Sequence, residues 1–112
     1  MYRKLGRNNK IRRSILAGLT KDVIMHESIV TTESRAKEVR KFVDKMITYG
    51  KDGSLVSRRK ALAFLQNDTV AVNKVFNELA KRYETRNGGY TRLVKLNERK
   101  GDDAMQIRIE LV

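Results

Sequence analysis

Seven cationic side chains precede Asp22, the first acidic residue of this 112-residue chain. They are Arg3, Lys4, Arg7, Lys10, Arg12, Arg13 and Lys21. Positive charge concentrated in this way repels itself unless a polyanion neutralises it. The pattern favours nucleic acid, because phosphates lie in a row and each lysine or arginine that meets one releases a counterion. An anionic membrane surface and a solvated terminal tail are the alternatives.

Three further basic groups extend this interpretation along the chain. They are Arg35, Lys37, Arg40 and Lys41; Arg58, Arg59 and Lys60; and Arg86, Arg92, Lys95, Arg99 and Lys100. Acidic neighbours partly balance the group at 35–41, so a solvated helix face explains it as well as RNA contact does. Arginine is prominent among these cations, which suits bidentate contact with phosphate. The candidate RNA-binding residues beyond the first group are Arg35, Lys37, Arg58, Arg59, Lys60, Arg86, Arg92, Arg99 and Lys100.

The overall composition agrees with a nucleic-acid binder. The chain has 25 Lys+Arg against 13 Asp+Glu, for a net charge of +12. It has no cysteine, which excludes disulfides and thiolate metal sites. No stretch approaches the roughly 20 apolar residues of a membrane-spanning helix. We therefore expect one cytoplasmic domain over residues 1–112, with no membrane partner.

Catalytic chemistry finds little support in the sequence. His26 is the only histidine, so a nucleophile–base pair would have to combine a serine or threonine with this one residue. Asp102 and Asp103 are neighbours in a predicted turn and are poorly placed to face one substrate atom. Gly88-Gly89 lacks the spacing of a nucleotide-binding loop and precedes a strand instead of following one. We therefore predict no enzyme activity, no cofactor, no metal and no small-molecule substrate.

Aromatic residues are few, with four tyrosines, three phenylalanines and no tryptophan. Phe42, Phe64 and Phe76 fall on apolar helical faces and are predicted to be core. Tyr2 and Tyr90 are the candidates for stacking on bases, although packing beneath a loop is the commoner role. Recognition of structured RNA by shape and phosphate contact is favoured over a stacking platform for single strands.

Hydrophobic periodicity predicts the helices that carry these cations. Residues 1–8 lack a period and are predicted to be an extended basic arm. From about Asn9, apolar residues at 11, 15, 19 and 23 form one helical stripe with Leu16 and Ile24 beside it, and the cations of this helix are predicted on its outer face. Thr32 is the predicted N-cap of a second helix that stops at Gly50. A third helix is predicted over 54–66, and a fourth begins after Asp68 as N-cap.

Strands are predicted from β-branched and alternating segments. Residues 29–32 form a short β-branched run, 90–96 read as a strand, and 105–111 alternate apolar with polar residues. A charged turn at 97–103 joins the last two into a hairpin. The order α-β-α-α-α-β-β predicts an α/β fold of the α+β type in two layers. A small mixed sheet of about three strands would be covered by helices on its apolar face.

Four segments together resemble one family. They are R-K-L-G-R at 3–7, I-V-T-T-E-S-R-A-K-E at 29–38, R-N-G-G-Y-T-R at 86–92 and I-E-L-V at 109–112. In this order they are similar to the bacterial ribosomal protein L-seventeen family of the large subunit. Two segments depart from the family pattern: Asn8-Asn9 replaces Thr-Ser, and N-E-R-K-G-D at 97–102 replaces G-P-R-R-G-D.

The resemblance implies a structural protein of the ribosome without catalytic activity. Its expected partners are large-subunit ribosomal RNA and neighbouring large-subunit proteins, near the exit of the nascent-chain tunnel. The resemblance implies that RNA is contacted by Arg3, Lys4, Arg7, Arg35, Lys37, Arg86 and Arg92. The alternatives are a free nucleic-acid chaperone or nucleoid-type DNA-binding protein, and an RNA-processing enzyme, which the scarcity of catalytic groups disfavours.

Overall fold

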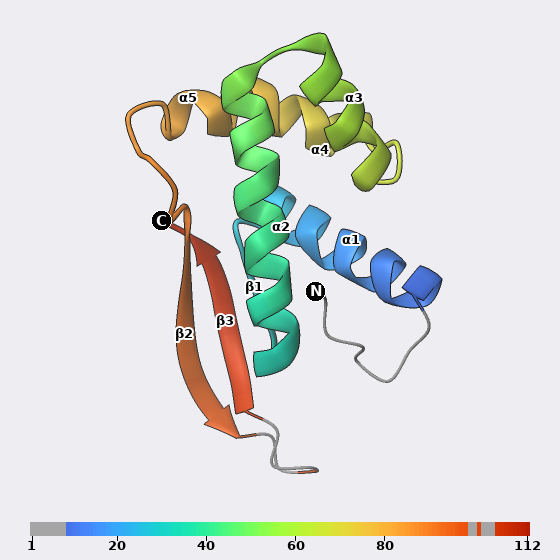
Figure 1. The fold of residues 1–112 in the computed structure, drawn as a ribbon. Coiled ribbons are helices and arrows are strands. Elements are labelled where there is room, and N and C mark those ends of the chain that lie inside the picture. Colours follow the sequence, from blue (N-terminus) through green and yellow to red (C-terminus); the bar gives the residue numbers. More distant parts are fainter. Residues whose placement is uncertain (1–8, 99–100, 102–104) are drawn as a thin grey trace.

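Helices and a small sheet form two layers in the computed structural model, which describes residues 9–98, 101 and 105–112 (Figure 1). The helices are α1 (Asn9–His26), α2 (Glu33–Asp52), α3 (Leu55–Phe64), α4 (Thr69–Lys74) and α5 (Ala80–Arg82), and a π-helical turn, η1 (Val75–Leu79), joins the last two. The strands are β1 (Ser28–Thr32), β2 (Thr91–Glu98) and β3 (Met105–Leu111). Because α4, η1 and α5 are continuous, the predicted order is confirmed. The predicted arm at 1–8 lies outside the described residues.

The sheet has the order β1-β3-β2, and both pairings are antiparallel. Ile109 in β3 pairs with Ile29 on one side and Leu93 on the other. The predicted hairpin of the last two strands is confirmed. The predicted mixture of parallel and antiparallel pairs is wrong for the described strands. Although β1 and β2 run in the same direction, β3 lies between them and runs against both.

Helix α2 is the centre of the fold. It contacts all three strands on one side and α1, α3 and η1 on the others (Figure 1). Its buried positions include Val39, Val43, Met46 and Ile47, which keep helical spacing as predicted. The inward residues of the alternating strand β3 join the same core, with Ile109 fully buried. Burying the apolar stripe of α2 therefore joins the sheet to the remaining helices.

Side-chain caps begin two of the helices. Ser54 accepts a hydrogen bond from the backbone N–H of Ser57 at 3.1 Å, and Asp68 accepts one from Ala71 at 3.1 Å. The predicted cap at Asp68 is confirmed, and it satisfies an N–H that the helix itself leaves without a partner. Thr32 occupies the N-cap of α2 with extended backbone, but its hydroxyl makes no capping hydrogen bond.

Gly50 does not end α2, which corrects the sequence prediction. The helix continues to Asp52 and ends at Gly53, whose φ of +70° suits glycine and whose N–H donates to the Tyr49 carbonyl at 3.0 Å. Gly50 is instead buried where α2 meets η1. A Cβ at this position would lie 2.9 Å from Cγ1 of Val75. The glycine therefore permits two helical segments to approach closely.

Candidate nucleic-acid interface

The cations of α1 divide between its two faces. Lys10 and Arg13 are exposed and Lys21 is half-buried. Arg12 was predicted on the outer face, but its residue is only 9% exposed. The buried positions of α1 are 12, 16, 17, 20, 23 and 24. Val23 of the predicted stripe and its neighbours Leu16 and Ile24 are buried as expected, whereas Ile11 is exposed, and the buried face also includes this arginine. Arg3, Lys4 and Arg7 lie outside the described residues.

The cations at the start of α2 have acidic neighbours. The Lys37 ammonium lies 3.0 Å from Glu33 Oε1, one turn away, and Arg35 is half-buried. Surface pairs of this spacing contribute only about 0.3–0.5 kcal/mol, so Lys37 could exchange its partner for a phosphate at little cost.

The triplet Arg58-Arg59-Lys60 does not act as one patch, because consecutive helical residues point in different directions. Arg58 donates from Nη2 to Oδ1 of Asn73 at 2.6 Å, and its guanidinium lies 4.9 Å from the centroid of the Phe76 ring. These contacts tie α3 to the helix that follows it. Arg59 and Lys60 are exposed. Arg58 therefore has a structural role that the other two lack.

The basic residues near the hairpin also have protein partners. Arg86 donates from Nη1 to the Gly89 carbonyl at 3.2 Å, across the turn that it begins. Arg92 Nη2 lies 2.6 Å from Glu110 Oε1 on the facing strand. Gly88 and Gly89 have φ values of +77° and +62°, in the region that glycine adopts most readily. Arg99 and Lys100 lie outside the described residues.

Tyr90 is not available for stacking on a base. It is 3% exposed, and its hydroxyl accepts a hydrogen bond from the Lys51 ammonium at 3.0 Å. The same hydroxyl donates to the Arg86 carbonyl at 3.2 Å. The hydrogen bond from Lys51 lowers the pKa of Tyr90 and outweighs burial, which raises it. Tyr90 anchors the turn, and the other stacking candidate, Tyr2, lies outside the described residues.

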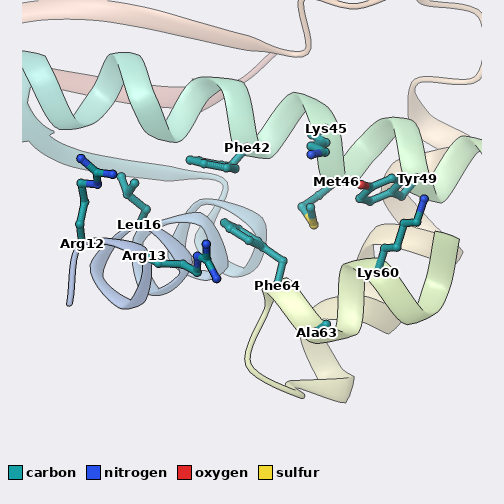
Figure 2. Close-up of a pocket in the computed structure, with 10 residues that line it drawn as sticks. All are labelled: Arg12, Arg13, Leu16, Phe42, Lys45, Met46, Tyr49, Lys60, Ala63 and Phe64. Carbon is teal, nitrogen blue, oxygen red and sulfur yellow. The ribbon is translucent and has the colours of Figure 1, made fainter. Parts of the chain in front are cut away.

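A groove with a volume of about 480 Å³ lies between α1, α2 and α3 (Figure 2). Its lining residues are Arg12, Arg13, Leu16, Phe42, Lys45, Met46, Tyr49, Lys60, Ala63 and Phe64. Phe42 from α2 and Phe64 from α3 stack with their ring centroids 4.7 Å apart and planes 20° from parallel. We call this the α1–α3 groove. It combines an aromatic floor with basic groups from three helices.

The electrostatic environment of the α1–α3 groove is positive. Four of the lining residues are arginine or lysine and none is acidic, within the part of the chain that the structure describes. Lys45 lies 5.9 Å from the centroid of the Tyr49 ring. Asp52 is near enough to Lys60 for that charge to contribute to its lowered pKa, but hydrogen bonds from the hydroxyls of Ser54 and Ser57 contribute more. The Asp52 carboxylate thus already accepts hydrogen bonds from two hydroxyls.

The sequence analysis missed Lys45 and the aromatic floor as candidate site residues. Phe42, Met46 and Tyr49 lie at i, i+4 and i+7 on one helical stripe, and Lys45 lies beside it. Such a stripe predicts burial in the hydrophobic core and not a binding site. Phe42 is buried, but Phe64 and Tyr49 are only half-buried. The available signal was a lysine next to an aromatic stripe, which by itself cannot reveal a groove.

A separate ion-pair cluster stabilises the fold away from the groove. Glu27 follows α1 with a φ of +64°, and its carboxylate lies 2.6 Å from Arg82 Nη1 and 3.1 Å from Lys74 Nζ. The hydrogen bond from Arg82 is the largest cause that lowers the pKa of Glu27 to about 2. Two cations are therefore engaged with a carboxylate, in contrast to Arg13, Lys45 and Lys60.

Other kinds of site find no support in the described residues. Within them, no group of three or more histidine, cysteine, aspartate or glutamate side chains could hold a metal ion. No helix of the described chain is long and apolar enough to span a membrane.

Comparison with known proteins gives one consistent result. Residues 15–112 match the family described as Ribosomal protein L17. The chain is 53% identical to the large ribosomal subunit protein bL17 of Ligilactobacillus salivarius, over 99% of this chain and 98% of that protein. It is 52% identical to the protein of the same name from Streptococcus gordonii and 51% identical to that of Streptococcus uberis, with the same coverage.

Proposed function

The chain belongs to the ribosomal protein L17 family and is a structural constituent of the large ribosomal subunit, and we propose that it binds folded ribosomal RNA there through its basic surface. As a member of this family it is a structural component and not an enzyme. The resemblance drawn from the sequence at 29–38 and 86–92 is confirmed by the match over nearly the whole chain.

The observation that carries the proposal is that α1 and α3 carry exposed cations for which the described residues provide no ion pair. Lys10 and Arg13 come from one helix and Arg59 and Lys60 from the other, and none has an ion pair among the described residues. An ammonium or guanidinium that has no protein partner gains most from a phosphate, because no existing pair has to be broken. The net charge of +12 supports the same interpretation.

The candidate residues can therefore be ranked by the partners they already have. Lys37 and Arg92 can bind phosphate only after breaking an ion pair with a carboxylate. Arg58 can do so only after breaking its hydrogen bond to Asn73. Within the described residues, Lys10, Arg13, Arg59 and Lys60 have no ion pair that would have to be broken. A location near the nascent-chain exit and contacts with neighbouring ribosomal proteins remain expectations from the resemblance.

The test is the salt dependence of binding to a transcript of large-subunit ribosomal RNA. The logarithm of affinity should fall with the logarithm of salt by about 0.7–0.9 units for each phosphate contact. Lys60→Gln should flatten the slope by about one contact. Lys81→Gln, which removes an exposed lysine on α5, is the control with the same change in net charge. Equal slopes for the two variants would contradict the assignment of the phosphate contacts to α1 and α3.

The arm is tested in the same assay. Neutralising Arg3, Lys4 and Arg7 together should flatten the slope by about two to three contacts. An unchanged slope would show that the arm does not meet phosphate. Sedimentation of the native protein with and without ribonuclease separates the proposal from a free nucleic-acid chaperone, because only a ribosomal constituent migrates stably with large subunits.

A further inference from the structure

We propose that the α1–α3 groove receives one unpaired nucleobase of the bound RNA, while the phosphates on either side of that nucleotide contact Arg13, Lys45 and Lys60. The inference rests on the RNA-binding function proposed above and adds a specific contact to it. It follows from the shape of the groove, the chemistry of its floor and the charge of its rim.

The groove has the size and shape of a small-ligand site. Its volume of about 480 Å³ lies within the range of about 300–1,000 Å³ that such sites occupy. Because Phe42 and Phe64 already stack on one another, the floor is formed before any ligand enters. Met46 is buried beneath it, and Tyr49 is half-buried at the side. A preformed floor lowers the entropy cost of binding.

The floor suits a flat, weakly polar group. Aromatic side chains bind nucleobases through their faces, and this contact tolerates any base because every base has a π face. Figure 2 shows Phe64 reaching from α3 toward Phe42 on α2, with Arg13 of α1 beside them. An arginine beside an aromatic pair can add contact with the plane of the base.

The charges at the rim of the groove favour an anionic ligand. Arg13, Lys45 and Lys60 come from three different helices and surround the groove (Figure 2). Arg13, Lys45 and Lys60 are exposed, so each can reach a phosphate without leaving the surface. A nucleotide joins a flat base with a π face to a phosphate at short distance, and the aromatic floor and cationic rim complement these two groups.

A protein partner fits the groove less well. Stable protein interfaces bury at least about 1,000 Å² in total, with a continuous apolar centre. The aromatic floor here is confined to one groove, which is also lined by the exposed cations Arg13, Lys45 and Lys60. The favoured occupant is therefore a single base with its phosphates.

The experiment compares two RNA hairpins that differ only at one position. One carries a single bulged adenosine, and the other carries an abasic ribose there, so both present the same number of phosphates. Full-length protein labelled at its methionine methyl groups is titrated with each and followed by NMR. Ring currents act at short range, so the bulged base should shift the methyl signal of Met46, which lines the groove. The methyl signal of Met25, which does not line the groove, should stay unchanged.

The affinities provide the second readout. We expect the abasic hairpin to bind about tenfold more weakly, as loss of one stacked base predicts. Phe64→Leu should remove most of this preference, while Phe76→Leu, a second half-buried phenylalanine outside the groove, should keep it. The Met46 measurement on the parent protein holds even if Phe64→Leu fails to fold.

The outcomes separate this inference from the proposed function. Equal affinity for both hairpins with an unmoved Met46 signal overturns the base site, while salt-dependent binding of both leaves phosphate contact intact. Binding of neither hairpin at low salt overturns the base site and counts against the proposed function as well. A shift of Met46 caused instead by an acidic, leucine-containing peptide would make the groove a protein-docking site and overturn the inference.

Discussion

Two helical glycines should respond to alanine with opposite signs. Gly50 is buried where α2 meets η1, and a Cβ there would lie 2.9 Å from Cγ1 and 3.0 Å from the carbonyl oxygen of Val75. Gly18 in α1 has no atom within 4 Å of an added Cβ among the described residues. The two substitutions make the same chemical change in the same kind of backbone, so they differ mainly in the space available.

The magnitudes follow from two competing effects. Alanine is better than glycine inside a helix by about 1 kcal/mol. Overpacking a core costs typically about 1–3 kcal/mol, and the upper part of that range applies at Gly50 because a backbone oxygen cannot rotate away. We therefore expect Gly50→Ala to lower the free energy of unfolding by about 1–2 kcal/mol and Gly18→Ala to raise it by about 1 kcal/mol.

Urea unfolding followed by far-ultraviolet circular dichroism measures both variants. The midpoint should fall for Gly50→Ala and rise for Gly18→Ala, with similar slopes. In a Val75→Ala background the cost of Gly50→Ala should shrink but persist, because the contact with the Val75 carbonyl remains. If Gly50→Ala gains as much stability as Gly18→Ala, the close approach of α2 and η1 is not a packing constraint.

Two further predictions concern the Glu27 cluster and the glycine turn. The pKa of Glu27 is lowered from 4.5 to about 2, so its ion pairs stabilise the fold fully above pH 4.5 and this contribution is lost as the pH falls toward about 2. Glu27→Gln should therefore cost about 1 kcal/mol at pH 7, a value reduced for solvent screening, and urea unfolding should show the difference narrowing below pH 4.5; a difference that does not change with pH would refute this. Gly88→Ala and Gly89→Ala should each lose about 1 kcal/mol, because both residues have positive φ although the space around them is open. Normal melting temperatures for both variants would show that the turn does not require glycine.

Local signals in the sequence were enough to predict the elements and the family. The alternation at 105–111 predicted β3, the carboxylate of Asp68 predicted the start of α4, and the β-branched run at 29–32 predicted β1. Each depends on neighbours a few residues away, so the sequence alone contains the information. The segments at 29–38 and 86–92 likewise identified the family without any knowledge of the fold.

Tertiary structure decided which residues form the candidate site. A glycine at position 50 reads as a helix stop until η1 is known to lie against it. Arg12 was predicted to be a surface cation, but the packing of α1 buries its side of the helix. The sequence allows Tyr90 two roles, stacking on a base or packing beneath a loop, and the hydrogen bond from Lys51 to the hydroxyl of this buried side chain decides for the second. The strand order, with β3 between β1 and β2, depends on pairs far apart in the sequence.

The α1–α3 groove shows the same limit most clearly. Arg13, Lys45 and Lys60 belong to three helices, and no spacing in the sequence relates one to another. Periodicity in the sequence predicts which face of each helix is apolar, but it does not predict where two packed helices leave a groove between them. That groove depends on how α1 and α3 pack against α2, and such packing is set by the shapes of side chains distant in the sequence.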